Sequence, residues 1–333
     1  MVLKPLLSHI ELELQRQVSR LDAPRTTPFH EMLKYHMGWT GEGAGPEATG
    51  KRIRPLMLLL CTVASGGDWN HALPAAAAVE LVHNFSLVHD DIQDNSPKRR
   101  GRDTAWIKWG APMAINVGDA LFVISNQSIN DLKEHYRAEI VVKAAEILHN
   151  TCLELTRGQF LDMSYEERID LTIEDYWPMI SGKTAALLAA SCQIGAVLSG
   201  AEESKEQAYR SFGHYLGLAF QVQDDILGIW GNEEATGKSA ASDLVEGKNS
   251  LPVLAGLGKK GKFAERWAKG PVRPEEVGDL ARLLASEGGL IVAQDASKQM
   301  TDLALMSLRE ADPQAEAGAE LFRLANGLLG RNQ

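Results

Sequence analysis

The sequence predicts an all-α protein, and three observations support this fold class. Apolar residues recur at spacings of three and four through long segments rich in Ala, Leu, Glu and Gln, which is the helical pattern. Short β-branched runs of period two are nearly absent. The chain has 333 residues, of which 44% are apolar and 23% charged, so it can bury a sizeable core.

The helical pattern runs through five long segments, separated by breaks rich in Gly, Pro or small polar residues. The segments are 72–94, 112–162, 172–198, 204–230 and 288–328. The breaks are 38–50, 65–70, 95–103, 199–204, 231–249 and 270–274. None of these breaks is long and polar enough to link two domains, so residues 1–333 are predicted to form a single domain.

Composition and charge exclude several classes of protein. A formal net charge of −10 argues against a nucleic-acid binder, whose footprint is a basic face. Residues 1–20 lack the features of a secretory signal, and the best apolar run, 55–64, is shorter than the roughly 20 residues of a membrane helix. We therefore expect a cytoplasmic protein without a transmembrane segment. Cys61, Cys152 and Cys192 are expected to be buried, reduced thiols.

The first long helix ends in aspartates. Asp90 and Asp94 are four residues apart, which places both carboxylates on one helical face. Mg²⁺ prefers oxygen ligands and usually keeps one or two protein carboxylates, with water and phosphate oxygens completing its shell. Apolar residues precede the pair, so the acids are expected at the end of a buried helix, where unpaired acids would be costly. A solvated helix end is the alternative for such a pair taken alone.

A second apolar helix ends in the same way. Asp224 and Asp225 follow Gln221, and the position four residues after Asp224 is Gly228, so this helix offers one carboxylate on that face. A single segment of this kind could arise by chance. Two of them in apolar settings form a more specific signal for a divalent cation site.

Two basic clusters, 51–54 and 98–102, lie in or beside predicted loops. Arginine forks bind phosphate oxygens bidentately and lysine adds a point charge, so loops of this kind beside a magnesium site suit a diphosphate. A solvated loop or a nucleic-acid contact is the alternative for either cluster alone. Residues 231–239 are not a nucleotide-binding P-loop, because the spacing of the glycines is wrong and no strand precedes them.

Together these motifs resemble those of the trans-isoprenyl diphosphate synthases, the family of farnesyl and geranylgeranyl diphosphate synthases. Gly50-Lys51-Arg52-Ile53-Arg54-Pro55 is similar to the family's Gly-Lys-Arg-x-Arg-Pro, and the segment from Asp90 to Asp94 is similar to its first Asp-Asp-x-x-Asp motif. The other segments that resemble the family are Arg99-Arg100-Gly101, Gly182-Lys183-Thr184, Phe220-Gln221 with Asp224-Asp225, Gly237-Lys238, and Lys248.

The resemblance implies a single polyprenyl synthase domain of the isoprenoid synthase fold, with helices around a deep apolar cavity, in a homodimer. It implies that isopentenyl diphosphate is held by Lys51, Arg54, His83 and Arg100, and the allylic diphosphate by Arg99, Lys183, Lys238 and Lys248. Three Mg²⁺ ions, bridged by the substrate diphosphate, would be held by Asp90, Asp94 and Asp224. Asp91 and Asp225 complete the two catalytic motifs, and Thr184 and Gln221 would line the reacting atoms; ordinary helix packing is the alternative for these last two.

The implied reaction is a head-to-tail (1′-4) condensation. Magnesium and the basic residues stabilise the departing diphosphate, the double bond of isopentenyl diphosphate attacks the allylic cation, and the released diphosphate takes the proton. A class I terpene cyclase and a noncatalytic partner subunit are the readings from other classes. Gly228 stands where many members have a third Asp; activity is expected to survive, because the first Asp of that motif is the expected ligand.

Product length is expected to depend on the residues just before the first acidic motif. Phe85, five residues before Asp90, can form the floor of the cavity, whereas the small Ser86 would let the chain pass. This pattern resembles the geranylgeranyl-producing type, so a C20 product is expected. Farnesyl diphosphate or a longer product is the alternative, and Phe85 is then a plain core residue.

Overall fold

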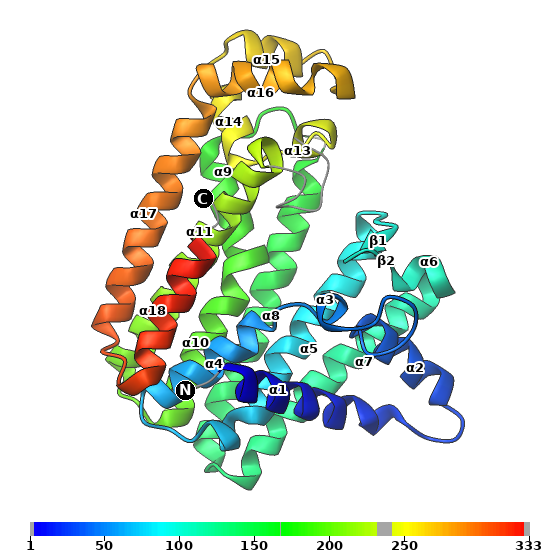
Figure 1. The fold of residues 1–333 in the computed structure, drawn as a ribbon, viewed down its shortest axis with the longest axis vertical. Helices are drawn as coiled ribbons and strands as arrows, with labels where there is room; N and C mark the ends of the chain where they lie inside the picture. Colours follow the sequence, from blue (N-terminus) through cyan, green and yellow to red (C-terminus); the bar gives the residue numbers. More distant parts are fainter. Residues whose placement is uncertain (1–2, 167, 232–241, 330–333) are drawn as a thin grey trace. The chain divides into compact units, whose positions relative to one another are not determined.

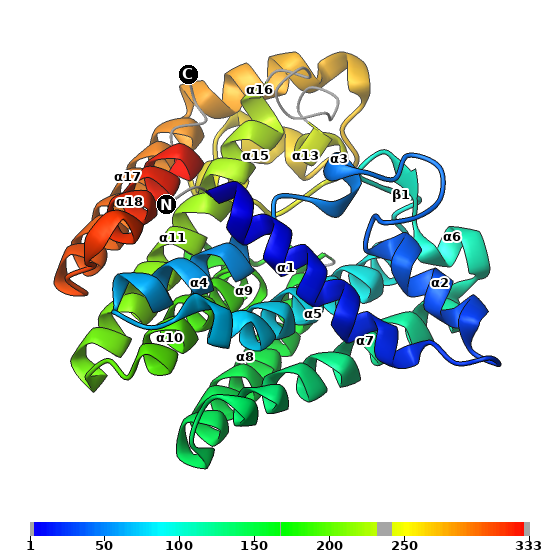
Figure 2. The same ribbon diagram turned by 60° about the horizontal axis from the view of Figure 1, so that its bottom comes forward.

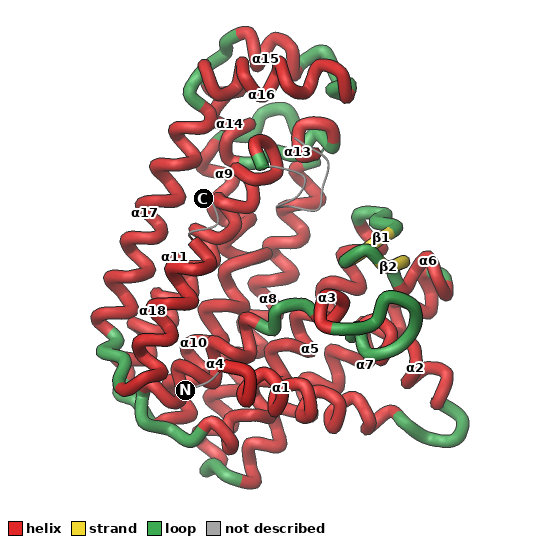
Figure 3. The backbone as a smooth tube through the Cα atoms, viewed as in Figure 1, coloured by secondary structure: helices red, strands yellow, loops and turns green. Residues whose placement is uncertain are grey.

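The computed structural model describes residues 3–166, 168–231 and 242–329, and this part of the chain consists mainly of helices joined by loops (Figure 3). Its only strands are β1 (Lys98–Arg99) and β2 (Arg102–Asp103), a short antiparallel hairpin in which Lys98 lies opposite Asp103. The prediction of an all-α fold is confirmed. The chain divides into two compact units, which we describe separately, and the single domain remains a prediction.

The first unit comprises Met1–Asn150, Ala190–Gln207 and Asp312–Leu321. Its helices are α1 (Leu3–Val18), η1 (Ser19–Leu21), α2 (Thr27–His36), α3 (Pro46–Thr49), α4 (Ile53–Ala64), α5 (Trp69–Gln93), α6 (Ala105–Trp109), α7 (Ala111–Asn130) and η2 (Asp131–Glu134). Helix α5 packs against α7 and α4, and α1 packs against α5 and α4 (Figure 2).

Helix α5 carries the first acidic motif and is the central helix of its unit. Its Ala and Val side chains are buried on several sides of the helix, as expected of a helix without a polar face. Asp68 is the N-cap of this helix, and its side chain accepts a hydrogen bond from the backbone N–H of Asn70. Ser128 Oγ of α7 donates to the carbonyl of Pro74, 2.7 Å away, and links the two helices. The acids at the end of α5 therefore stand on a rigid support.

The second unit comprises Thr151–Ala189, Ala208–Ala311 and Phe322–Gln333. Its elements are α9 (Ile173–Ile180), the π-helical turn η3 (Ser181–Ala185), α13 (Ser242–Val245), α14 (Leu251–Gly258), α15 (Lys262–Trp267), η4 (Pro274–Glu276), α16 (Val277–Ser286) and α17 (Gly289–Glu310). Four helices contribute residues to both units: α8 (Ala138–Tyr165), α10 (Ala186–Ser199), α11 (Glu203–Trp230) and α18 (Ala315–Leu329).

The core of the second unit has two parts. Tyr176 and Val222 belong to the first, a buried cluster that brings residues of α9, α11, α14 and α17 together. Phe263 of α15 and Leu284 of α16 belong to the second. Helix α14 packs against α17 (Figure 1). The first cluster includes residues of α11 beside Asp224 and so supports the second acidic motif.

Two of the predicted helical segments are interrupted. Segment 112–162 breaks at 131–137, where a 3₁₀ turn follows α7, and the sequence there holds no Gly or Pro to signal the break. Segment 288–328 breaks around Pro313, beside Asp312 in a left-handed conformation with φ of 50°. The predicted loop 95–103 contains the hairpin, and residues 232–241 of the predicted loop 231–249 lie outside the described part of the chain.

The helical stretch predicted as 172–198 has the expected length, but it is more apolar than the prediction of no membrane-spanning segment implies. Among the described residues, only Ile173–Ser199 is long and apolar enough to cross a membrane by length and composition. Its apolar window has a mean hydropathy of 1.2 and is 72% buried within the structure. This burial accounts for its composition as that of a core helix. Cys61 and Cys192 are buried and Cys152 is half-buried, and all three are free thiols.

Candidate functional site

The acids of the first motif have different environments. Asp91 is 2% exposed and accepts a hydrogen bond of 2.8 Å from Arg99 Nε, while Arg99 Nη2 lies 3.4 Å from Asp90 Oδ2. Burial raises the pKa of Asp91 to about 6, and Arg99 opposes this shift. Asp94 is exposed and forms the C-cap of α5, with its N–H on the carbonyl of Asp90 at 2.9 Å. Asp91 therefore faces inward and is held by Arg99.

The remaining acids of this motif suit a hard cation. Asp90 and Asp94 lie at the C-terminal end of α5, where the helix dipole is negative and disfavours additional negative charge. Within the described residues, no group of three His, Cys, Asp or Glu side chains gathers as a complete metal site. Mg²⁺ needs only one or two protein carboxylates and takes water and phosphate oxygens as its other ligands. The donor set of this helix end fits that ion.

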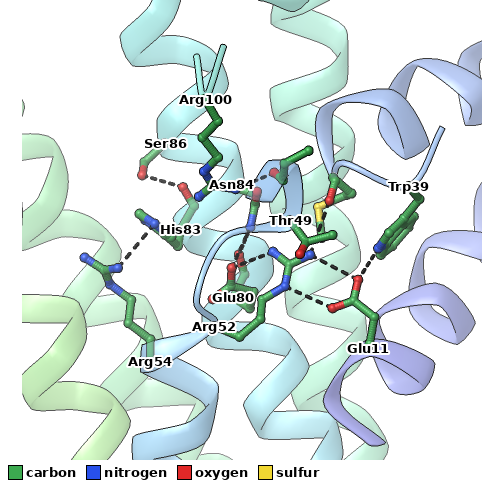
Figure 4. A network of polar contacts seen from close by, with 12 residues as sticks. Glu11, Trp39, Thr49, Arg52, Arg54, Glu80, His83, Asn84, Ser86 and Arg100 are labelled. Atoms are coloured by element: carbon green, nitrogen blue, oxygen red, sulfur yellow. Dashed lines mark hydrogen bonds and ion pairs between the residues drawn. The ribbon is translucent and has the colours of Figure 1, made fainter. Parts of the chain in front are cut away.

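Basic side chains gather beside the N-terminus of α4. Arg54 Nη1 donates to His83 Nε2 at 3.2 Å, and the Nε of Arg54 is buried without a hydrogen-bond partner (Figure 4). Burial lowers the pKa of His83 well below its ordinary value, and Arg54 and then Arg100 lower it further. Burial also lowers the pKa of Arg54 and of Arg100. Because these neighbouring basic groups disfavour one another's positive charge, an anion bound between them would stabilise their charged forms.

The loop before α4 has an unusual backbone that brings it close to Arg100. Gly50 has φ of 78°, and a Cβ at this position would lie 2.6 Å from Arg100 Cζ. Arg100 Nη1 donates to the carbonyl of Ala48 at 2.8 Å. Arg52 and Arg100 both adopt left-handed conformations, with φ of 48° and 51°. Each such conformation costs a residue with a Cβ roughly 1–2 kcal/mol, and strain of this kind is typical of functional sites. Lys51, in the same loop, is exposed.

Phe85, one of the two residues expected to control product length, contacts an aromatic side chain that was not predicted from the sequence. The ring of Phe85 lies 5.0 Å from that of Phe122 on α7 and 5.4 Å from that of His89. Ser86 Oγ donates to the carbonyl of His83 at 2.8 Å. Phe122 is one of many apolar residues of α7, so only the packing of α5 against α7 distinguishes it.

In the second motif, Asp225 is a buried anchor. It is 6% exposed and accepts three hydrogen bonds, from Tyr176 Oη at 2.7 Å, Gln221 Nε2 at 3.0 Å and the backbone N–H of Leu251 at 3.1 Å. Burial raises the pKa of Asp225 to about 6, and these donors oppose the shift. They connect α9 and α14 to α11. Asp224, which is only partly buried, is left as the candidate ligand.

Thr184 and Lys183 lie in the π-helical turn η3, a feature often found at functional sites. Thr184 Oγ1 donates to Gln221 Oε1 at 2.7 Å, and Lys183 forms an ion pair with Asp162 of α8. The turn lies directly against α8, because a Cβ at Gly158 would be 2.1 Å from the backbone N of Lys183. Gly158 therefore allows the backbone approach that positions both side chains.

The glycine that replaces the third acid of the second motif has a carboxylate beside it. A Cβ at Gly228 would lie 2.1 Å from Oδ2 of Asp243, a residue of α13 that is 6% exposed. Lys248 Nζ lies 3.6 Å from Asp243 Oδ1 and 2.7 Å from Glu246 Oε2. Asp243 has no motif spacing to Asp224, so the sequence alone does not single it out. Lys238 lies outside the described residues.

Comparisons with known proteins cover all of these positions. A family model described as polyprenyl synthetase matches residues 45–284. A (2E,6E)-farnesyl diphosphate synthase of Mycobacterium tuberculosis is 38% identical over 329 residues, covering 96% of this chain and 89% of that protein. A geranylgeranyl diphosphate synthase of the same organism is 38% identical over 291 residues, covering 85% and 82%. The crystal structure of a polyprenyl synthetase from Streptomyces coelicolor A3(2) superposes with a TM-score of 0.88 at 35% identity, covering 98% of each chain.

Proposed function

This chain belongs to the polyprenyl synthetase family and is a trans-prenyltransferase that extends isoprenoid diphosphates, and from this premise we propose that it makes geranylgeranyl diphosphate. Its substrates are isopentenyl diphosphate and an allylic diphosphate. Relatives named for farnesyl and for geranylgeranyl diphosphate are equally similar at 38% identity, so the product length is argued from the residues of this chain.

The group formed by Arg54, His83 and Arg100 is the observation that carries the proposed substrate class. A diphosphate brought beside them would offset the cost of their burial and mutual repulsion, and it would offer an acceptor to the buried Nε of Arg54. Lys51 would add a point charge from the loop before α4. We assign this group to isopentenyl diphosphate.

The allylic diphosphate is assigned to the acidic motifs and the cations beside them. Asp90, Asp94 and Asp224 would hold the Mg²⁺ that this family uses, and we propose three ions. Bound Mg²⁺ supplies positive charge to the departing diphosphate. Arg99, Lys183 and Lys248 are proposed to contact the same diphosphate, with Lys238 as a fourth cation. Arg99, Lys183 and Lys248 form ion pairs with Asp91, Asp162 and Glu246 respectively. These ion pairs support the assignment, because they restrict side chains that would otherwise be mobile.

The remaining chemistry requires no protein nucleophile. Ionisation of the allylic diphosphate leaves a carbocation, the double bond of isopentenyl diphosphate attacks it, and a proton then leaves for the released diphosphate. Gln221 is oriented by the Thr184 hydroxyl on its oxygen and by Asp225 on its nitrogen, so its dipole has a fixed direction beside Asp224. We propose that Gln221 and Thr184 line the reacting carbons, where water must be excluded.

The C20 assignment rests on Phe85. An α-helix rises 1.5 Å per residue, so the separation of five positions from Phe85 to Asp90 corresponds to about 7.5 Å along the axis. The packing of Phe85 on Phe122 supports a fixed aromatic floor at that depth. Ser86 presents only a small hydroxyl, which its bond to the His83 carbonyl holds against α5. The deep apolar cavity, the homodimer and the cytoplasmic location remain predictions from the sequence.

The test is an assay of the purified protein with labelled isopentenyl diphosphate and dimethylallyl, geranyl or farnesyl diphosphate, with Mg²⁺ or with EDTA. We expect a Mg²⁺-dependent product that yields a C20 alcohol after dephosphorylation. A C15 or longer product would keep the reaction and reject the Phe85 floor. Release of a cyclic hydrocarbon without condensation would identify a terpene cyclase, and absence of any turnover would identify a noncatalytic subunit.

A further inference from the structure

Arg52 lies between two residues assigned to isopentenyl diphosphate, yet it faces away from solvent. It is 5% exposed and is the N-cap of α4, with φ of 48° and ψ of 39°. Lys51 precedes it and Arg54 lies in the first turn of the helix that follows. The backbone conformation of Arg52 therefore sets the direction in which Lys51 leaves the loop and the point at which α4 begins.

The guanidinium of Arg52 is held between two carboxylates from different helices (Figure 4). Its Nη1 donates to Glu80 Oε1 of α5 at 2.8 Å. Its Nε and Nη2 donate to the two oxygens of Glu11 of α1, at 3.1 Å and 3.2 Å. Nη2 also reaches the carbonyl of Met37 at 3.3 Å. One arginine thus connects the loop before α4 to α1, α5 and the end of α2.

Both carboxylates are themselves oriented by other groups. The side-chain amide of Asn84, 1% exposed, donates to Glu80 Oε1 at 3.0 Å and to the Glu80 carbonyl at 2.8 Å. The indole N–H of Trp39 donates to Glu11 Oε1. Glu80 is 2% exposed, so its charge has little access to water and depends on the arginine. The cluster is a connected polar network, and such networks favour one arrangement of the elements that they join.

The network also fixes the spacing between the two halves of the proposed diphosphate site. Glu80 and His83 are three residues apart on α5 and share a face of that helix. The ion pair between Arg52 and Glu80 therefore holds the loop and first turn that carry Lys51 and Arg54 at a set position against the helix face that carries His83. With the loop at this position, Arg54 Nη1 lies 3.2 Å from His83 Nε2.

We propose that Arg52, clamped by Glu11 and Glu80, is a positioning residue for the isopentenyl diphosphate site. It does not touch the substrate; it holds a left-handed backbone conformation that an arginine would not adopt readily without these partners. The proposal rests on the proposed function, in that Lys51 and Arg54 must bind isopentenyl diphosphate for their placement to matter.

The test compares Arg52→Gln with Arg52→Lys in steady-state kinetics with both substrates varied. For Arg52→Gln we expect the KM for isopentenyl diphosphate to rise about tenfold or more, equivalent to about 1.4 kcal/mol. The KM for the allylic substrate and kcat at saturation should change less than about threefold. Arg52→Lys should give a smaller rise, since lysine keeps the charge but not the fork.

Because Arg52→Gln leaves Glu80 buried without its partner, a double variant keeps the test valid if the single variant folds poorly. Arg52→Gln combined with Glu80→Gln removes both charges, and we expect its KM for isopentenyl diphosphate to rise above the wild-type value, because this variant also lacks the ion pair that holds the loop. Arg282→Gln is the matched control, because it removes an arginine of a surface ion pair that is 76% exposed; its constants should equal those of the wild type. Urea unfolding of each variant separates folded from misfolded protein.

Two outcomes overturn the proposal. The first is a folded Arg52→Gln protein whose KM for isopentenyl diphosphate is unchanged. The second is an Arg52→Gln protein in which the KM values for both substrates rise together. Lys51→Ala distinguishes this failure from that of the proposed function. If Lys51→Ala leaves the KM for isopentenyl diphosphate unchanged, the assignment of the site is wrong, whereas a rise in Lys51→Ala without a rise in Arg52→Gln rejects only the role of Arg52.

Discussion

Replacing Gly158 by alanine should impair catalysis although the substitution adds a single methyl group in mid-helix. The new Cβ would lie 2.1 Å from the backbone N of Lys183, and ordinary contacts begin near 3.4 Å, so α8 and η3 would have to separate by about 1.3 Å. Backbone atoms on both sides leave no flexible side chain to yield. A displacement of about 1 Å at reacting groups can cost roughly 10²-fold in rate, and η3 carries Lys183 and Thr184.

Two opposing effects determine the free energy of unfolding of the Gly158→Ala variant. Alanine gains up to about 1 kcal/mol over glycine in a helix interior, whereas overpacking costs about 1–3 kcal/mol. We expect a net loss of about 0–2 kcal/mol in urea unfolding and a fall in kcat of roughly 10²-fold. Gly278→Ala on α16 is the control, because the nearest atom is the end of Arg282, 3.7 Å away; it should be stabilised with kcat unchanged. Wild-type kcat in Gly158→Ala would refute the role of this contact.

Three further predictions concern other parts of the two units. Phe85→Ala should lengthen the product beyond C20, and the double variant Phe85→Ala/Phe122→Ala should lengthen it further. Mass spectrometry of the dephosphorylated alcohol measures the product length, and an unchanged C20 product would contradict the aromatic floor. Burial, followed by the charges of Arg99 and Arg100, lowers the pKa of His36 from 6.5 to about 3. Below pH 6.5 the unfolded chain therefore binds a proton that the folded protein excludes, and the free energy of unfolding falls. His36→Gln should remove a loss of about 2 kcal/mol between pH 7 and pH 5 in urea unfolding, and an unchanged pH dependence would reject this origin. Gly228→Asp should cost about 1–3 kcal/mol through overlap with Asp243, and adding Asp243→Gly should recover part of that loss; a single variant as stable as the wild type would show that Asp243 moves aside.

The sequence was sufficient to predict the fold class and the helices that carry the motif residues, because both depend on local spacing. Helical periodicity identified α5 and α11, and the placement of acids near their C-terminal ends follows from the same pattern. The partners of these residues could not be inferred in this way. Tyr176 and Asp162 reach the motif residues only through tertiary packing of segments far away in the chain. Gly158 was visible as an isolated glycine in a helical pattern, a signal of close approach that needs a known neighbour to be interpreted.

The two Asp-Asp pairs show why spacing alone did not separate the roles of adjacent acids. Neighbouring residues of an α-helix point about 100° apart, so a helix that is packed on one side turns one acid of each pair inward and leaves the other accessible. Asp91 and Asp225 are the inward members, and each is held by donors that oppose the rise in its pKa. Asp90 and Asp224 are thereby left as the proposed ligands.

In the proposed site, each pair of adjacent acids would provide one anchor and one ligand, and a second ligand on the same face would have to come from four residues away or from another element. In the first motif Asp94, the C-cap of α5, is the proposed second ligand. In the second motif position 228 has no side chain, and the carboxylate of Asp243 lies where that side chain would begin. The glycine is then compatible with a working motif, because any larger residue would displace an acid that is already there.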